Sequence, residues 1–135
     1  MIIGVGIDVC IINRIENTIN KFGVKFKQRC FTENEILKCE GRYNSAPCYA
    51  KRFAAKEAFS KAIGTGIRNG INWRLIEVIN NKKGQPFIKL HGKAKETLDG
   101  LIPKNMIPKV FISLTDEKEL AQAFVIIEAI RKDTI

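Results

Sequence analysis

The sequence lacks an uninterrupted apolar run of about 18 residues, the length that a membrane-spanning helix needs, so we expect no membrane insertion. The first twelve residues are hydrophobic, but they carry no basic leader and are interrupted by Asp8. This pattern predicts a first strand rather than a signal peptide, and hence a cytoplasmic protein. There is no internal repeat or low-complexity tract, and 135 residues are enough for a single domain, 1–135.

Zinc ligands are scarce and poorly spaced. The chain has one histidine, His91, and four cysteines without a CxxC pair, namely Cys10, Cys30, Cys39 and Cys48. A core of this size does not need disulfides, so we expect free thiols in a reducing compartment. His91 is expected to be a surface or strand-end residue.

Aromatic residues make up only 8% of the chain and are not interleaved with basic residues. No nucleic-acid-binding motif is present either, which disfavours a small basic nucleic-acid-binding module, although the net charge of +9 alone permits one. That charge predicts an acidic partner or substrate through long-range attraction.

Local patterns predict a mixed α/β or α+β domain. We expect about five strands and three or four helices. The strands are residues 2–9, a hairpin of "INWRLIEVIN" and "QPFIKLHG", and the pair "KVFISLTD" and "AQAFVIIEAI". The helices are residues 11–22, a short one after the Thr32–Glu35 capping box, a long one over 47–63, and one over 93–101.

Asp8 is a carboxylate inside an apolar strand, where it costs several kcal/mol unless a cation or hydrogen bonds compensate it. Glu57, in the long predicted helix, lies away from the main apolar stripe, and we expect it to be partly buried. Two such carboxylates can hold Mg²⁺, which takes its other ligands from water and phosphates. Lys61 stands one turn after Glu57, so an ordinary surface ion pair is the alternative.

Basic residues in two places could serve a binding function. Arg52, Lys56 and Lys61 would hold phosphate beside the proposed metal, and "GTG" at 64–66 offers a flexible backbone, although there is no P-loop. Arg14, Lys21 and Lys25 lie opposite the isoleucines of the first helix. They form either a solvated face or a docking surface.

"GIDVCIINRIE" and "RFAAKEAFSKAIGTGI" resemble the two signature motifs of the holo-acyl-carrier-protein synthases, small bacterial 4′-phosphopantetheinyl transferases. The resemblance also includes "CFTENE", "NKKGQPFIKLHG" and "SLTDEKELAQAFVIIEA". It implies the 4′-phosphopantetheinyl transferase fold, with mostly antiparallel strands around a long central helix. It also implies that the phosphopantetheine arm of coenzyme A is transferred to a serine of apo acyl carrier protein for fatty acid biosynthesis, leaving adenosine 3′,5′-bisphosphate.

The resemblance assigns roles to particular residues. Asp8 and Glu57 are implied Mg²⁺ ligands and, with Lys61 beside the transferring phosphate, the implied catalytic residues. The implied coenzyme A contacts are Arg52, Lys56, Lys61, Gly64, Thr65, Gly66, Gly84 and Pro86. The implied face toward the carrier protein is Arg14, with Lys21, Lys25 and Arg29 as an extension.

Three features of the reaction stay open at this level. The base that accepts the serine proton could be Glu57, directly or through a metal-bound water. Many relatives have a histidine where this chain has Phe111, so that histidine's role does not transfer. The resemblance also implies a homotrimer with shared active sites, in which Asp8 and Glu57 need not act with the arginines of their own subunit.

Overall fold

The computed structural model describes residues 1–134, which contain five strands and five α-helices. The strands are β1 (Ile2–Ile11), β2 (Ile76–Asn80), β3 (Pro86–Leu90), β4 (Met106–Glu117) and β5 (Leu120–Arg131). The α-helices are α1 (Ile12–Phe22), α2 (Val24–Cys30), α3 (Glu33–Glu40), α4 (Ala46–Ala62) and α5 (Gly92–Leu101), and the 3-10 turns are η1 (Trp73–Leu75) and η2 (Lys132–Thr134). The expected mixed fold class is confirmed, and α2 is the one α-helix that the pattern did not predict.

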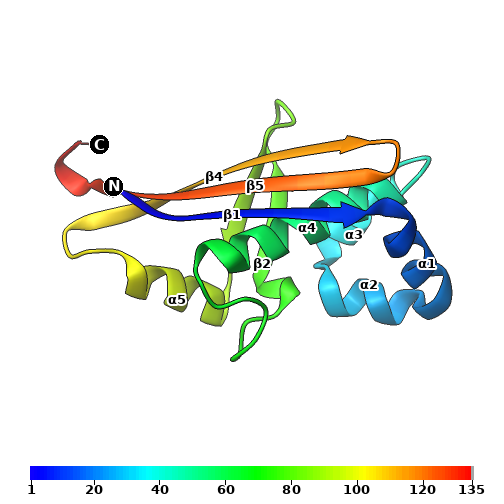
Figure 1. The fold of residues 1–135 in the computed structure, drawn as a ribbon, viewed down its shortest axis with the longest axis horizontal. Helices are drawn as coiled ribbons and strands as arrows, with labels where there is room; N and C mark the ends of the chain where they lie inside the picture. The colour runs from blue at the N-terminus through cyan, green and yellow to red at the C-terminus, as the bar shows by residue number, and fades with distance from the viewer. Residues whose placement is uncertain (135) are drawn as a thin grey trace.

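The strands form two antiparallel sheets. One has the order β1-β5-β4, and the other is the β2–β3 hairpin. The hairpin runs across the direction of the larger sheet, with α4 lying beside both and with α1 and α2 at the end remote from the two termini (Figure 1). The strand β1 leads directly into α1, and Asp8, three residues before the end of β1, contacts Lys61 of α4.

Two glycines let β1 approach α4 very closely. A Cβ added to Gly4 would lie 1.9 Å from the carbonyl oxygen of Ala62, and one added to Gly6 would lie 1.8 Å from that of Ala58. No side chain fits at such distances, so only glycine permits this packing. The spacing of two residues also fixes which face of β1 meets the helix, namely the face that carries Gly4, Gly6 and Asp8.

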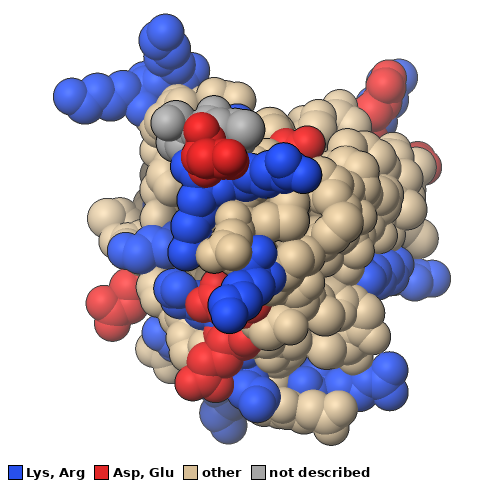
Figure 2. Space-filling model, turned by 90° about the vertical axis from the view of Figure 1, so that its left-hand side faces the viewer, with Lys and Arg blue, Asp and Glu red and all other residues tan. Residues whose placement is uncertain are grey.

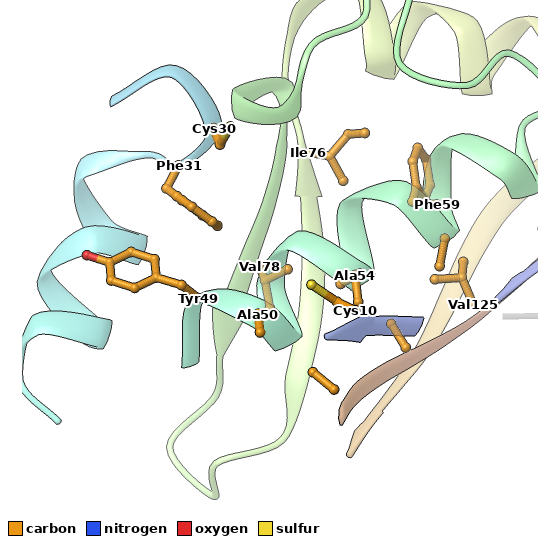
Figure 3. Packing of buried hydrophobic residues seen from close by; sticks show 14 of the residues in the cluster. Cys10, Cys30, Phe31, Tyr49, Ala50, Ala54, Phe59, Ile76, Val78 and Val125 are labelled. Carbon is orange, nitrogen blue, oxygen red and sulfur yellow. The ribbon is translucent and has the colours of Figure 1, made fainter. Parts of the chain in front are cut away.

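The core extends along α4, which is buried on almost all sides. At its N-terminal end Tyr49 packs against Phe31, with ring centroids 4.9 Å apart, and towards its C-terminal end Phe59 faces the sheet near Val125 (Figure 3). The sequence pattern predicted a main apolar stripe on this helix and partial burial of Glu57 on another side. The helix has more than one buried side because the sheet, the hairpin and α1–α3 pack around it.

The opposite face of the larger sheet is apolar and exposed. Val5, Ile7 and Val9 of β1 are 52%, 49% and 53% exposed. Ile126 and Phe111 are in register with Val5, and Phe124 is in register with Ile7. We call Val5, Ile7, Val9, Phe111, Phe124 and Ile126 the outer apolar face. The apolar run of the first strand suggested burial on both of its faces. Within one chain only the face toward α4 is buried.

The expectation of four free thiols is wrong for two of them. Cys39 of α3 and Cys48 of α4 form a disulfide, with Cα atoms 5.4 Å apart. The turn between α3 and α4 reverses the chain and brings these two residues together, a proximity that a spacing of nine residues does not reveal. Cys10 and Cys30 are free and buried.

No helix among residues 1–134 is long and apolar enough to cross a membrane.

Candidate active site

Asp8 and Lys61 meet where β1 packs on α4. The Lys61 ammonium donates to Asp8 Oδ1 at 2.9 Å and to the Ile7 carbonyl at 3.0 Å. The Asp8 side chain is 19% exposed and that of Lys61 is 53% exposed, so this pair faces solvent from the lysine side. Lys61 therefore pairs with Asp8 rather than with Glu57, which was the alternative that the helix spacing allowed.

Glu57 lies one turn before Lys61 on α4 and is partly buried, as expected. Its Oε1 accepts a hydrogen bond from the indole Nε1 of Trp73 at 2.9 Å. Because residues four apart share a helix face, Glu57, Lys61 and the bound Asp8 lie on one side of α4. The structure thus brings the three predicted catalytic residues together.

The pKa of the Cys10 thiol is affected by the charged residues near Asp8 and Glu57. Burial raises its pKa to about 11, and the charges of Asp8 and Glu57 act in the same direction while Arg14 opposes them. Both carboxylates are thus near enough to the same thiol to influence it. The Cys10 thiol stays protonated at neutral pH, which gives it the role of a core residue rather than a nucleophile.

The two carboxylates fit a hard divalent cation. Asp8 Oδ2 and Glu57 Oε2 accept no hydrogen bond from any residue in 1–134, so each group has one oxygen engaged and one available. Mg²⁺ commonly takes one or two carboxylates and completes its shell with water and substrate phosphates. Residues 1–134 contain no cluster of three or more His, Cys, Asp or Glu that could hold a metal without such a substrate.

The expected contact between Lys56 and phosphate is wrong. The Lys56 side chain is fully buried, and its ammonium donates to Glu35 Oε1 at 2.7 Å and to the carbonyls of Trp73 and Ile76 at 2.8 and 2.7 Å. Burial lowers the pKa of Lys56, and the Glu35 carboxylate opposes that shift. All three ammonium protons are used inside the protein, so Lys56 is a structural residue.

Arg52 lines a cavity of about 380 Å³. Gly84 and Pro86, which the resemblance implies as coenzyme A contacts, line the same cavity. Its other lining residues are Arg42, Asn44, Pro47, Cys48, Lys51, Asn80, Leu114 and Asp116. Arg52 is largely buried and donates to Asn80 Oδ1 at 2.7 Å and to Cys48 Sγ at 3.3 Å. Its Nε has no partner among residues 1–134, and burial lowers its pKa. A buried guanidinium with an unused donor suits an anion.

Gly64, Thr65 and Gly66 form the turn that ends α4. The amides of Thr65 and Gly66 both donate to the Ser60 carbonyl, at 3.2 and 3.1 Å, and Gly64 and Gly66 have φ of 83° and 69°. A Cβ on Gly64 would meet no atom within 4 Å, so this turn is open to an incoming group. It lies at the opposite end of α4 from the cavity.

The expected site is therefore divided within one chain. Arg52 and Glu57 are five residues apart on α4, which turns about 100° per residue, so their side chains point about 140° apart. The cavity and the Asp8–Glu57–Lys61 group occupy different sides of this helix.

The four predicted docking residues all lie on the surface. Arg14 and Lys21 are on α1, Lys25 and Arg29 are on α2, and none forms an ion pair with a carboxylate of residues 1–134. The Arg29 guanidinium lies 5.8 Å from the centre of the Trp73 ring. At the far end of the molecule basic and acidic side chains are interspersed (Figure 2).

His91 directly follows β3, and its Nε2 lies 3.0 Å from Glu77 Oε1. The hydrogen bonds to Glu77 from Thr32, His91 and Asn34 outweigh the effect of its burial and hold its pKa below the usual value. His91 is thus a strand-end residue, as predicted. Phe111 belongs to the outer apolar face.

Comparison with known proteins places the chain in a family. Residues 4–125 match the model of the 4'-phosphopantetheinyl transferase superfamily, and the chain belongs to that superfamily. A holo-[acyl-carrier-protein] synthase of Methylorubrum populi is 51% identical over 130 residues, which cover 96% of each chain. The resemblance seen in the sequence motifs is confirmed.

Solved structures agree with this assignment. A holo-[acyl-carrier-protein] synthase from Neisseria meningitidis has a TM-score of 0.82 and 37% identity and covers 95% of this chain and 99% of its own. The Helicobacter pylori synthase, solved in complex with coenzyme A, has a TM-score of 0.78 and 31% identity and covers 92% of this chain and 99% of its own. None of these similarities supports a nucleic-acid-binding module.

Two contacts at the site were missed from the sequence. Trp73 was assigned to a strand, although it lies in η1 and reaches Glu57. Trp73 is the only tryptophan in the chain, and this could have marked it as a candidate site residue. Asn80 gave no such signal, because only the packing of β2 against α4 brings it to Arg52.

Proposed function

We propose that this chain transfers the 4′-phosphopantetheine group of coenzyme A to a serine of apo acyl carrier protein, as one domain, for fatty acid biosynthesis in the cytoplasm. The observation that carries the proposal is the meeting of Asp8, Glu57 and Lys61 on one side of α4, next to a basic surface. Family membership and relatives that are named holo-[acyl-carrier-protein] synthase support it.

The chemistry is an in-line displacement. The serine hydroxyl attacks the β-phosphorus of coenzyme A, and adenosine 3′,5′-bisphosphate leaves. Such transfers depend mainly on positioning and on electrostatic stabilisation of the phosphate oxygens. The protein must therefore hold the diphosphate, supply positive charge and accept one proton.

We assign these tasks to residues of the site. Asp8 and Glu57 would hold Mg²⁺, which when bound supplies Lewis-acid stabilisation of charge on the diphosphate. The Lys61 ammonium, 2.9 Å from Asp8 Oδ1 and exposed to solvent, can donate to a phosphate oxygen while it stays near Asp8. Glu57 is the candidate acceptor for the serine proton, directly or through a water.

The cavity around Arg52, Gly84 and Pro86 would bind the nucleotide part of coenzyme A. Its wall carries Arg42 and Arg52, together with Lys51, whose ammonium lies 2.9 Å from Asp116 Oδ1 in the same wall. The unpartnered Arg52 Nε favours an anionic ligand. The turn 64–66 would approach the same ligand from another copy of the chain.

A homotrimer with shared active sites accounts for two otherwise unexplained features. The outer apolar face needs a cover, and a second copy of the chain offers an equally apolar one. The site is also divided between two sides of α4. Sharing between subunits would unite the Asp8–Glu57–Lys61 group of one copy with the cavity of its neighbour.

The test is intact-mass spectrometry of apo acyl carrier protein after incubation with coenzyme A and Mg²⁺. The wild-type chain should add the phosphopantetheine mass, whereas Asp8→Ala and Glu57→Ala should each abolish the addition. Asp99→Ala is the control, because it removes an exposed carboxylate that pairs only with Lys95 on α5. Normal turnover by Asp8→Ala or Glu57→Ala would refute the assigned roles.

A further inference from the structure

Trp73 is the single tryptophan of the chain and lies outside the motifs that carry the family resemblance. Its indole Nε1 donates to Glu57 Oε1 at 2.9 Å and so connects η1 to α4. We propose that Trp73 is a positioning residue that orients the Glu57 carboxylate for its cation and substrate. This inference rests on the proposed function of Glu57.

The indole ring is held by two neighbours. Phe53 of α4 stacks on it, with ring centroids 5.8 Å apart and planes inclined by 24°. The Arg29 guanidinium of α2 lies 5.8 Å from the ring centre. Turning the indole away from Glu57 would lose both contacts, so the direction of its N–H is fixed by packing.

The backbone that carries Trp73 is also held. Lys56 donates to the carbonyls of Trp73 and Ile76, at either end of η1, and Asn72 Oδ1 accepts from the Arg74 amide at 3.1 Å. Lys56 and Glu57 are consecutive on α4. One of them therefore holds the main chain of Trp73 and the other receives its indole.

This arrangement decides which oxygen of Glu57 is available. The indole occupies Oε1, and Oε2 accepts no hydrogen bond from residues 1–134. A donor on one carboxylate oxygen fixes the plane of the group and presents the other oxygen in one direction. Loss of such outer contacts commonly lowers metal affinity or activity by about 10-fold to 100-fold.

The first test compares Trp73→Phe with Phe53→Leu. Trp73→Phe keeps a stacking ring but removes the N–H, whereas Phe53→Leu disturbs the stacking but keeps the N–H. We expect Trp73→Phe to lower the affinity for Mn²⁺, measured by electron paramagnetic resonance with coenzyme A present, and kcat by about 10-fold, with an unchanged KM for the carrier protein. Phe53→Leu keeps the N–H and the Arg29 contact but loses one support of the ring, so it should lose less than Trp73→Phe in both quantities.

A second variant protects the test against misfolding of Trp73→Phe. Because the chain has one tryptophan, growth of an auxotroph on benzothienylalanine changes only position 73 and replaces the indole N–H by sulfur. This protein should keep the wild-type melting temperature and show the same losses of Mn²⁺ affinity and kcat.

The outcomes separate this inference from the proposed function. If both N–H-deficient proteins match wild type in Mn²⁺ affinity and kcat while Glu57→Ala loses both, the positioning role of Trp73 is refuted and the function stands. If Glu57→Ala also matches wild type, the proposed role of Glu57 fails and the inference fails with it. Mn²⁺ quenching of Trp73 fluorescence that disappears in Glu57→Ala would support both.

Discussion

At the scale of single residues, the position of Asp8 depends on two neighbours that have no side chain. Gly4 and Gly6 allow β1 to lie against the carbonyls of Ala62 and Ala58, and this approach brings Asp8 within 2.9 Å of the Lys61 ammonium. Glycine at position 6 is therefore a condition for the Asp8–Lys61 contact as well as for the core.

We predict that Gly6→Ala destabilises the protein by about 1–3 kcal/mol, because its Cβ would overlap backbone that cannot move alone. Transfer activity should fall as well, since β1 must shift away from Lys61. Gly100→Ala is the matched control. It lies in α5 with no atom within 4 Å of the added Cβ, so it should leave stability unchanged or raise it by about 0.5–1 kcal/mol. Urea unfolding at equal protein concentration measures the stability of both variants. Equal midpoints for Gly6→Ala and wild type would contradict this account.

Burial of individual cations could not be predicted from the sequence. Arg52 and Lys56 stand in one motif four residues apart, yet Arg52 lines a cavity and Lys56 is enclosed by Glu35 and two carbonyls. The partner of Lys56 comes from the capping box of α3, 21 residues earlier. Contacts between residues far apart in the chain decide such cases, and local pattern contains no information about them.

At the scale of elements, four basic residues of α1 and α2 have no acidic partner within residues 1–134, namely Arg14, Lys21, Lys25 and Arg29, whereas Lys27 of α2 pairs with Glu40. Most such residues on a protein surface are simply solvated. Here Arg14 also lies near enough to Cys10 to lower its pKa, alongside the opposing influence of Asp8. Arg14 therefore lies on the side of α1 that is near Asp8, which is where the proposed docking surface would need it.

We predict that Arg14→Glu weakens binding of apo acyl carrier protein by about 10-fold in low salt, with coenzyme A affinity unchanged. The loss should shrink as salt is added, because exposed charges are screened. Lys104→Glu changes the net charge equally but lies on the loop before β4, so it should bind the carrier protein like wild type. Calorimetric titrations at two salt concentrations measure the difference, and equal weakening by both variants would show that only net charge matters.

Much of the fold at this scale could be predicted. Period-two and period-3.6 patterns located all five strands and four of the five α-helices among residues 1–134, and the Thr32–Glu35 capping box is present as predicted. The helix α2 was not predicted, because Gly23, which ends α1, was interpreted as the end of helical structure. A second helix begins at the next residue. The disulfide and the cavity depend on how elements pack together, and so lay beyond these patterns.

At the scale of the whole molecule, the two parts of the candidate site do not come together within one chain. The Asp8–Glu57–Lys61 group and the cavity that contains Arg42 lie on different sides of α4, and the outer apolar face of the sheet is uncovered. A ring of identical subunits would remove both difficulties, because the equivalent apolar faces could meet around its axis while each interface joins the Asp8–Glu57–Lys61 group of one copy to the cavity of the next.

Subunit mixing tests this sharing directly. Asp8→Ala removes one carboxylate of the candidate catalytic group. Arg42→Glu places a negative charge at the exposed rim of the cavity, where it should repel the anionic nucleotide. Each variant alone should be inactive. If each site takes Asp8 from one subunit and the cavity from the next, trimers assembled from equal amounts of both variants contain sites with two intact halves. Random mixing should then restore about one quarter of wild-type transfer.

Co-refolded variants are assayed by the mass increase of the carrier protein, with separately refolded variants mixed afterwards as the control. Because no single chain in the mixture has both Asp8 and Arg42 intact, restored activity requires a shared site, and its absence from verified mixed trimers would place the whole site in one subunit.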